Sequence, residues 1–286
     1  MKKSDACAPK TAAPLSAEEL SDYRLHRRFD RMARLVGDGA MEKLFKSHVL
    51  VAGLGGVGSW AAEAAARAGV GRLTLVDFDA VCVTHANRQL HALDETVGRP
   101  KASVMAARLR QVNPRAEVRA VARFLDQAAL PELFREKPDF VIDAIDSVAS
   151  KCQLLAYCKE HAVPVVTSTG SGGRLDPTQV RVADLSKTQS DPLARDIRRI
   201  LREKHGFPKK EWAAFGIPAV FSAEPHRKPK ELHYDHGKGF RCVCPQKDNP
   251  FFNCDSRNLI YGNAGFVTGA FGLAAASAAV RGILGE

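Results

Sequence analysis

The chain has 286 residues, of which 45% are apolar and 26% are charged, the balance of an ordinary globular protein with one large or two small domains. Its net charge of +10 favours an acidic partner such as nucleic acid, although a basic surface kept for solubility explains that charge equally well. Seven cysteines without framework spacing argue against a disulfide scaffold and indicate a reducing compartment, so we expect a cytoplasmic protein.

Strand and helix patterns alternate along the chain after a polar leader, residues 1–20, which we expect to be disordered. The predicted strands are 48–52, 72–77, 116–124, 139–146 and 163–170, and helices are predicted at 99–114, 128–137 and 147–162. This order predicts an α/β fold with a Rossmann-like, doubly wound and mostly parallel sheet. Right-handed crossovers then bring the polar residues that follow each strand to one edge of the sheet.

We divide the domain into a core at residues 21–175, which includes the nucleotide site argued below, and a C-terminal extension at 176–286. The extension comprises an added strand at 179–186, an amphipathic helix at 190–206, a basic loop region at 206–258 with a strand at 216–225, and a closing helix at 262–284. The uncharged part of the closing helix approaches the length of a membrane span. Its many Gly and Ala residues favour burial against the sheet, so we expect no membrane contact.

A glycine-rich turn follows the first predicted strand. The run Gly53-Leu54-Gly55-Gly56-Val57-Gly58 fits G-x-G-x-x-G between a strand and a helix. Such glycines let the backbone approach phosphates at a helix N-terminus, where unpaired N–H groups favour anions. The motif predicts a nucleotide site but does not distinguish a dinucleotide from ATP.

Charged residues beyond this turn favour ATP. Asp77 ends the second predicted strand, where a carboxylate binds ribose hydroxyls. Asp79 by itself suits a simple turn residue equally well. Arg88 and Lys101 add cations for which a dinucleotide has little use, whereas a triphosphate under attack needs them.

Two further carboxylates, Asp143 and Asp146, lie at the end of the fourth predicted strand. Carboxylates there can hold Mg²⁺ together with phosphate oxygens, while the alternative for Asp146 is a helix cap. Zinc is not expected, because Cys242 and Cys244 form only a C-x-C, Cys254 follows alone, and no C-x-x-C pair occurs.

These motifs together resemble those of the ubiquitin-activating-enzyme-like superfamily, which includes the sulfur-carrier adenylyltransferases. The similar segments are GLGGVGSW, LVDFDAVCVTHANRQ, VGRPKA and VIDAIDS, within residues 24–170. A narrower resemblance, to the tRNA threonylcarbamoyladenosine dehydratases, is carried by RRFDRMARLVG, NRQLHAL, LLAYC and GGRLDPTQVRVADLSKTQSDPLARDIRRILR. It implies a homodimer that uses ATP to adenylate the carboxylate of threonylcarbamoyladenosine in tRNA, whose side chain then closes into a cyclic form.

The resemblance also implies roles for individual residues. Gly53, Gly55 and Gly56 approach the nucleotide, Asp77 binds its ribose, Asp79, Asn87, Arg88, Gln89 and Lys101 surround its phosphates, Asp146 helped by Asp143 holds Mg²⁺, and Arg28 reaches into the partner's site. Without the resemblance, Arg28 is one charge on a solvated helical face. His85 replaces the family's usual asparagine, and its role stays open.

Alternative functions share the same ATP residues. An adenylyltransferase that activates the C-terminal glycine of a small sulfur carrier is disfavoured because such enzymes usually have two C-x-x-C zinc pairs. A sulfur-relay partner of a cysteine desulfurase would act through Cys242, Cys244 or Cys254. The basic run 225–242, with Tyr234 and Phe240, suits either a nucleic acid backbone or a solvated loop.

Overall fold

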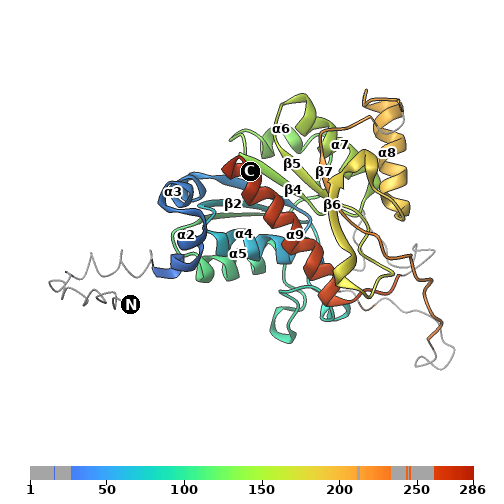
Figure 1. Ribbon diagram of the computed structural model, residues 1–286. Helices are drawn as coiled ribbons and strands as arrows, with labels where there is room; N and C mark the ends of the chain where they lie inside the picture. Colours follow the sequence, from blue (N-terminus) through green and yellow to red (C-terminus); the bar gives the residue numbers. More distant parts are fainter. Residues whose placement is uncertain (1–15, 17–26, 211–212, 233–242, 244, 246–260) are drawn as a thin grey trace, which may run out of the picture.

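The computed structural model describes residues 16, 27–210, 213–232, 243, 245 and 261–286 (Figure 1). The predicted leader lies outside the described residues apart from Ser16, and so do Tyr234, Phe240 and the three cysteines of the basic loop region. In the part described, seven strands form one sheet in the order β3-β2-β1-β4-β5-β7-β6. The strands are β1 (His48–Ala52), β2 (Arg72–Val76), β3 (Glu117–Val121), β4 (Phe140–Asp143), β5 (Val165–Ser168), β6 (Val180–Asp184) and β7 (Pro218–Ser222).

Every neighbouring pair in this sheet is parallel except β6 with β7, which confirms the predicted Rossmann-like, mostly parallel sheet. Strands β1, β4 and β5 are buried along their whole length, as expected for strands covered on both faces. Strands β6 and β7 of the C-terminal extension belong to the same sheet, with β7 between β5 and β6.

Helices cover both faces of the sheet (Figure 1). They are α2 (Asp30–Val36), α3 (Asp38–Lys46), α4 (Gly58–Ala68), α5 (Lys101–Val112), α6 (Leu130–Leu133), α7 (Val148–Glu160), α8 (Pro192–Lys204) and α9 (Gly265–Leu284). Alternate residues of β1 point to opposite faces: Val49 and Val51 join the core cluster that includes α4, α5 and α9, whereas Leu50 joins the one that includes α7 and α8. The helix predicted at 128–137 is shorter than expected, since α6 has four residues.

Helix α9 packs against α4 and against one face of the sheet. Its mean hydropathy of 1.5 over an 18-residue window would suit a membrane span, yet 56% of that window is buried in the protein. Small residues make this possible, because a Cβ added to Gly272 would lie only 2.7 Å from Trp60 Cβ of α4. The prediction of a helix buried against the sheet is confirmed.

Candidate active site

The strand order places the predicted nucleotide residues at one edge of the sheet. Strand β1 lies between β2 and β4, so Gly53, Asp77 and Asp143 follow or end three adjacent parallel strands. The Gly53 N–H donates to Val76 O at 2.8 Å, and Leu54 N–H donates to the Asp77 carboxylate at 2.6 Å. These bonds fix the glycine turn against the end of β2.

The three predicted glycines do different things in this turn. Gly53 has a φ of +84°, and an added Cβ would lie 2.7 Å from Ala144 O, so both conformation and space require glycine. Gly56 lies against Thr268 of α9, 3.2 Å from an added Cβ, whereas Gly55 has nothing within 4 Å. Of the three, Gly55 is the one whose missing side chain leaves open space for a ligand.

Asp77, Asp79 and Lys101 form a compact charged cluster. Asp79 N–H donates to Asp77 at 2.8 Å, and Lys101 Nζ contacts Asp79 Oδ2 at 2.8 Å. The chain brings them together because Lys101 N–H donates to Asp79 O and Ala80 bridges Pro100, so the segment after β2 lies along the start of α5. Lys101 is 3% exposed, so its ammonium group is held by this pairing.

Burial and charge act against each other in the cluster. Burial raises the pKa of Asp77, although Lys101 and two backbone N–H donors oppose the rise. Burial by itself lowers the pKa of Lys101, but Asp77 and Asp79 outweigh it, so the net pKa of Lys101 is raised and its cation is favoured.

The predicted Asn87-Arg88-Gln89 run is presented by a tight turn. His85, at the end of a short 3-10 helix (η1, Val83–His85), accepts the Cys82 N–H on Nδ1 at 3.0 Å and so caps that turn. His85 O then accepts the N–H groups of Arg88 and Gln89. His85 therefore acts as a structural cap of this turn. The sequence alone left its role open.

Arg88 and Gln89 occupy different environments. Arg88 donates to Thr84 O and to Asn87 Oδ1, both at 2.9 Å, and its carbonyl accepts the indole N–H of Trp60 at 3.1 Å. Gln89 is 6% exposed, and its Oε1 has no hydrogen-bond donor within the described part of the chain. A buried acceptor of this kind suits a bound polar ligand.

Asp143 is placed differently from the prediction. It is fully buried, and Oδ2 contacts Lys151 Nζ at 2.6 Å and the Thr167 hydroxyl at 2.6 Å. Its Oδ1 accepts the Ile145 N–H at 3.1 Å. With its oxygens engaged in this way, Asp143 holds the loop that leads to Asp146.

Asp146 itself is exposed at the edge and contributes to raising the pKa of Lys101, so it lies within electrostatic range of the charged cluster. No hydrogen bond or ion pair of its carboxylate occurs within the described segments. Those segments also contain no group of three or more His, Cys, Asp or Glu residues suited to hold a metal without other ligands.

Arg28 does not meet these residues within one chain. It is exposed, and its guanidinium lies 3.4 Å from the carbonyls of Gln111 and Val112, at the end of α5. Lys101 begins that helix, about 16 Å away at 1.5 Å per residue. Of the cysteines described, Cys82, Cys152 and Cys158 are buried thiols, and burial raises the pKa of Cys152 to about 11, which makes it unreactive.

Sequence reasoning missed the residues that support the site. Lys151 was visible only as a lysine in an apolar helical pattern, and Trp60 as an aromatic residue of α4. Asn263, whose carbonyl accepts the Asn87 amide at 2.9 Å, lies 176 residues away from it in the chain. None of these positions has a local signal, because each role depends on a contact between distant segments.

Comparison with known proteins places this site in a family. The model of the ThiF family matches residues 29–286. The chain belongs to the ThiF family. Among curated relatives, the tRNA threonylcarbamoyladenosine dehydratase of Escherichia coli K12 is 43% identical over 259 residues, covering 89% of this chain and 92% of the relative. The dehydratase of Bacillus subtilis 168 is 40% identical over 232 residues, covering 79% and 88%.

Two further comparisons show how far the similarity extends. The crystal structure of the E. coli dehydratase in complex with ATP has a TM-score of 0.77 and 40% identity, and the match covers 91% of this chain and 95% of that one. The E. coli molybdopterin-synthase adenylyltransferase is 37% identical over 188 residues, which is 65% of this chain and 72% of the relative. The similarity to dehydratases thus extends over more of the chain.

Proposed function

We propose that this protein is an ATP-dependent tRNA threonylcarbamoyladenosine dehydratase. The observation that carries the proposal is the 43% identity to a curated dehydratase over 89% of the chain, which includes the C-terminal extension. The geometry supports it, because the buried cluster of Asp77, Asp79 and Lys101 and the turn that carries Arg88 lie at the same edge of the sheet as the glycine turn. A relative solved with ATP shows that this fold binds the nucleotide.

Each part of the edge has a task in binding ATP. The open space beside Gly55 admits the phosphates, and the N–H groups at the start of α4 face them. Asp77, held by Leu54 N–H and Asp79 N–H, accepts the ribose hydroxyls. Gln89 Oε1 supplies a buried acceptor for a donor on the nucleotide or substrate.

The reaction divides one difficult dehydration into two substitutions. A carboxylate oxygen of threonylcarbamoyladenosine attacks the α-phosphorus of ATP, and pyrophosphate leaves. A nucleophile of the same side chain then attacks the acyl carbon, and AMP leaves with the former carboxylate oxygen, so the substrate loses one water in total. Arg88 and Lys101 neutralise charge on the phosphates in the first step. Proximity within one side chain replaces an enzyme nucleophile in the second.

Magnesium fits this site in one respect. Asp146 offers an exposed carboxylate beside the phosphate region, and Mg²⁺ commonly uses one or two carboxylates plus substrate phosphates instead of an all-protein cage. When bound, the ion would supply Lewis-acid neutralisation of phosphate charge. Asp143 would contribute by holding the Asp146 loop through Ile145 N–H.

A homodimer completes the proposal. Arg28 lies at the far end of α5 from Lys101, so it reaches a phosphate region only if a second copy supplies it. Mixing inactive Arg28→Ala and Arg88→Ala proteins tests this, because shared sites recover partial activity in mixed dimers. No recovery contradicts the trans role. A tRNA substrate, and the unpaired thiols of the three cysteines that the structure describes, support a cytoplasmic location.

Activation of a sulfur-carrier protein is the second candidate, supported by the 37% identity to an adenylyltransferase. The sulfur-relay hypothesis rests on Cys242, Cys244 and Cys254, outside the described residues, and their replacement by serine should abolish activity if it holds.

Nucleosides of tRNA from cells with and without the gene decide between these candidates. We expect the cyclic nucleoside to disappear in the deletion strain and to return with the wild-type gene. Persistence of the cyclic form in a strain without a paralogue would overturn the dehydratase proposal.

A further inference from the structure

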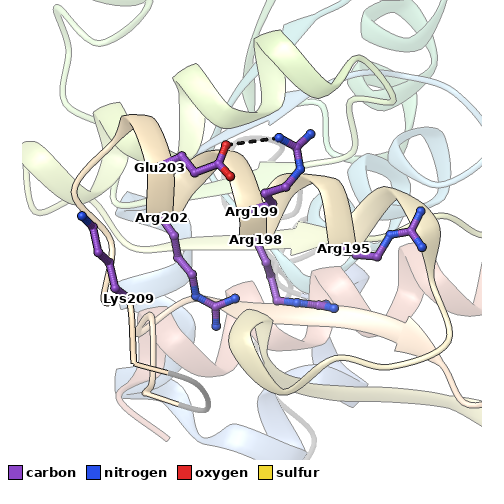
Figure 2. Close-up of a pocket in the computed structure, with 6 residues that line it drawn as sticks. All are labelled: Arg195, Arg198, Arg199, Arg202, Glu203 and Lys209. Carbon is purple, nitrogen blue, oxygen red and sulfur yellow. Dashed lines mark hydrogen bonds and ion pairs between the residues drawn. The ribbon is translucent and has the colours of Figure 1, made fainter.

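Helix α8 presents a concentration of arginines at the surface. An open hollow of about 600 Å³ is lined by Arg195, Arg198, Arg199, Arg202, Glu203 and Lys209 (Figure 2). Five of these six side chains are cationic and one is acidic. The opposite face of the helix is anchored in the core by Ala194, Ile197 and Leu201, so the arginines project from a fixed backbone.

Most of this charge is not neutralised by acids. Glu203 pairs with Arg199 at 3.1 Å. Arg198 donates to the Thr188 hydroxyl and Arg202 to Pro208 O, both uncharged acceptors. No ion pair of Arg195, Arg198 or Arg202 with a carboxylate is found across the segments that the structure describes. Burial lowers the pKa of Arg198, and the neighbouring Arg202 and Arg195 lower it further, whereas the Asp191 carboxylate opposes the shift.

Some exposed arginines elsewhere pair with acids. Arg34 pairs with Asp30 at 3.0 Å, and Arg123 pairs with Glu132 at 2.9 Å. Those pairs are typical of a solvated surface, where each cation has an acid nearby. The row on α8 keeps its positive field, and neighbours three or four residues apart place the guanidinium groups along one line of the helix.

The helix begins at the edge of the sheet that holds the ATP residues. Arg174, buried after β5, donates to Gly170 O at 3.0 Å and to Ser190 O at 2.8 Å. Asp191 then caps α8 by accepting the Ala194 N–H at 2.7 Å. Since β5 is the neighbour of β4, about 4.8 Å away, the arginine row starts next to the side of the edge where Asp146 lies.

We propose that the arginine face of α8 holds the phosphate backbone of the tRNA beside the modified base. The proposal rests on the proposed function, which supplies a polyanion whose reacting base must enter the same edge. Phosphate contacts of this kind position a nucleic acid without selecting its sequence. They also make binding depend on salt, because each neutralised phosphate releases counterions.

Binding of an unmodified tRNA transcript to the full-length protein tests this surface. Replacing both Arg195 and Arg198 by Gln should weaken tRNA binding about tenfold at physiological salt. The slope of log K against log salt should become shallower by about 1.4 to 1.8, the value expected for two lost phosphate contacts. The matched control is Arg119→Gln with Arg123→Gln, which removes the same charge at and just beyond β3, at the opposite end of the sheet.

The proposal would be overturned if the α8 variant bound tRNA with wild-type affinity and salt slope, or if the control lost as much affinity. It would also be overturned if the arginine face of α8 bound acidic proteins but not tRNA. Arg195→Glu, at an exposed position, gives the same test if the double variant does not fold. Failure of the proposed function can be distinguished from failure of the α8 proposal, since wild type and control would then both fail to convert modified tRNA. If that function holds, the α8 variant should raise KM for tRNA and leave kcat and ATP affinity unchanged.

Discussion

The nucleotide end of the sheet and the α8 end arrange charge in opposite ways. Around Asp77 and Lys101 the charged groups are buried and paired, and backbone N–H groups hold their orientation. Along α8 the arginines face an open hollow with one acid among them. Buried pairs fix the geometry that a phosphoryl substitution needs, whereas an open cationic row attracts and holds an extended anion.

We therefore expect a change at the nucleotide end to alter kcat, and a change on α8 to alter KM for tRNA. Arg88→Ala should have the largest effect, since the lost cation should reduce kcat for dehydration about 1000-fold at saturating ATP and tRNA. The control is Arg99→Ala, an exposed arginine on the same loop system, which should keep kcat within about twofold. Single-turnover rates measure both, and equal losses would mean that positive charge alone, not its position, matters.

The buried Lys151–Asp143 pair should be the most sensitive point for stability. Lys151→Met leaves Asp143 charged and without its cation, which should lower the free energy of unfolding by about 3–5 kcal/mol. Adding Asp143→Asn should restore most of that loss, because the amide still accepts the Thr167 hydroxyl. Denaturant unfolding measures this, with Lys46→Met, an exposed lysine, as control. A small effect of Lys151→Met would contradict the account of this end as organised by buried pairs.

His91 gives the nucleotide end a dependence on pH. Burial, with Lys101 and Arg108 nearby, lowers the pKa of His91 to about 3. The unfolded chain therefore takes up a proton near pH 6.5 that the folded protein does not, so stability is lost as pH falls below that value. Between pH 7 and 5 this loss should be about 2 kcal/mol.

His91→Phe removes this term while filling the same space, so its unfolding free energy should fall less over that range. Urea unfolding of both proteins at several pH values gives the difference. Parallel curves for the two proteins would show that His91 takes up its proton equally well when folded.

The smallest effect is expected at the contact between α4 and the arginine turn. Trp60→Phe keeps an aromatic ring beside Gly269 but removes the donor to Arg88 O. The free energy of unfolding should fall by about 1 kcal/mol, and kcat should fall a few-fold with KM for ATP unchanged. A changed ATP affinity with normal kcat would instead place Trp60 in nucleotide binding.

Sequence patterns predicted the parts of the fold that depend on local periodicity. Strands and helices alternate as predicted. The carboxyl ends of β1, β2 and β4 lie at one edge of the sheet, as expected for adjacent parallel strands. The position of β7 between β5 and β6 was not predictable, since strand order across the sheet depends on packing of segments far apart in the chain.

Asp143 shows the limit for the site. Its D-x-x-D spacing suggested a second carboxylate near magnesium, but its partners come from α7 and β5 and turn it into a core residue. His85 is the converse case, since its partner Cys82 is three residues away, and the capping contact explains how a histidine is accommodated in the turn.

This edge of the sheet should adenylate a carboxylate of modified tRNA. The most direct measurement incubates purified protein with ATP and tRNA that contains threonylcarbamoyladenosine, then quantifies AMP and the nucleosides. We expect AMP and the cyclic nucleoside to form in equal amounts, and neither to form with Arg88→Ala. Unchanged tRNA, together with adenylation of a small protein's C-terminal glycine, would contradict the claim.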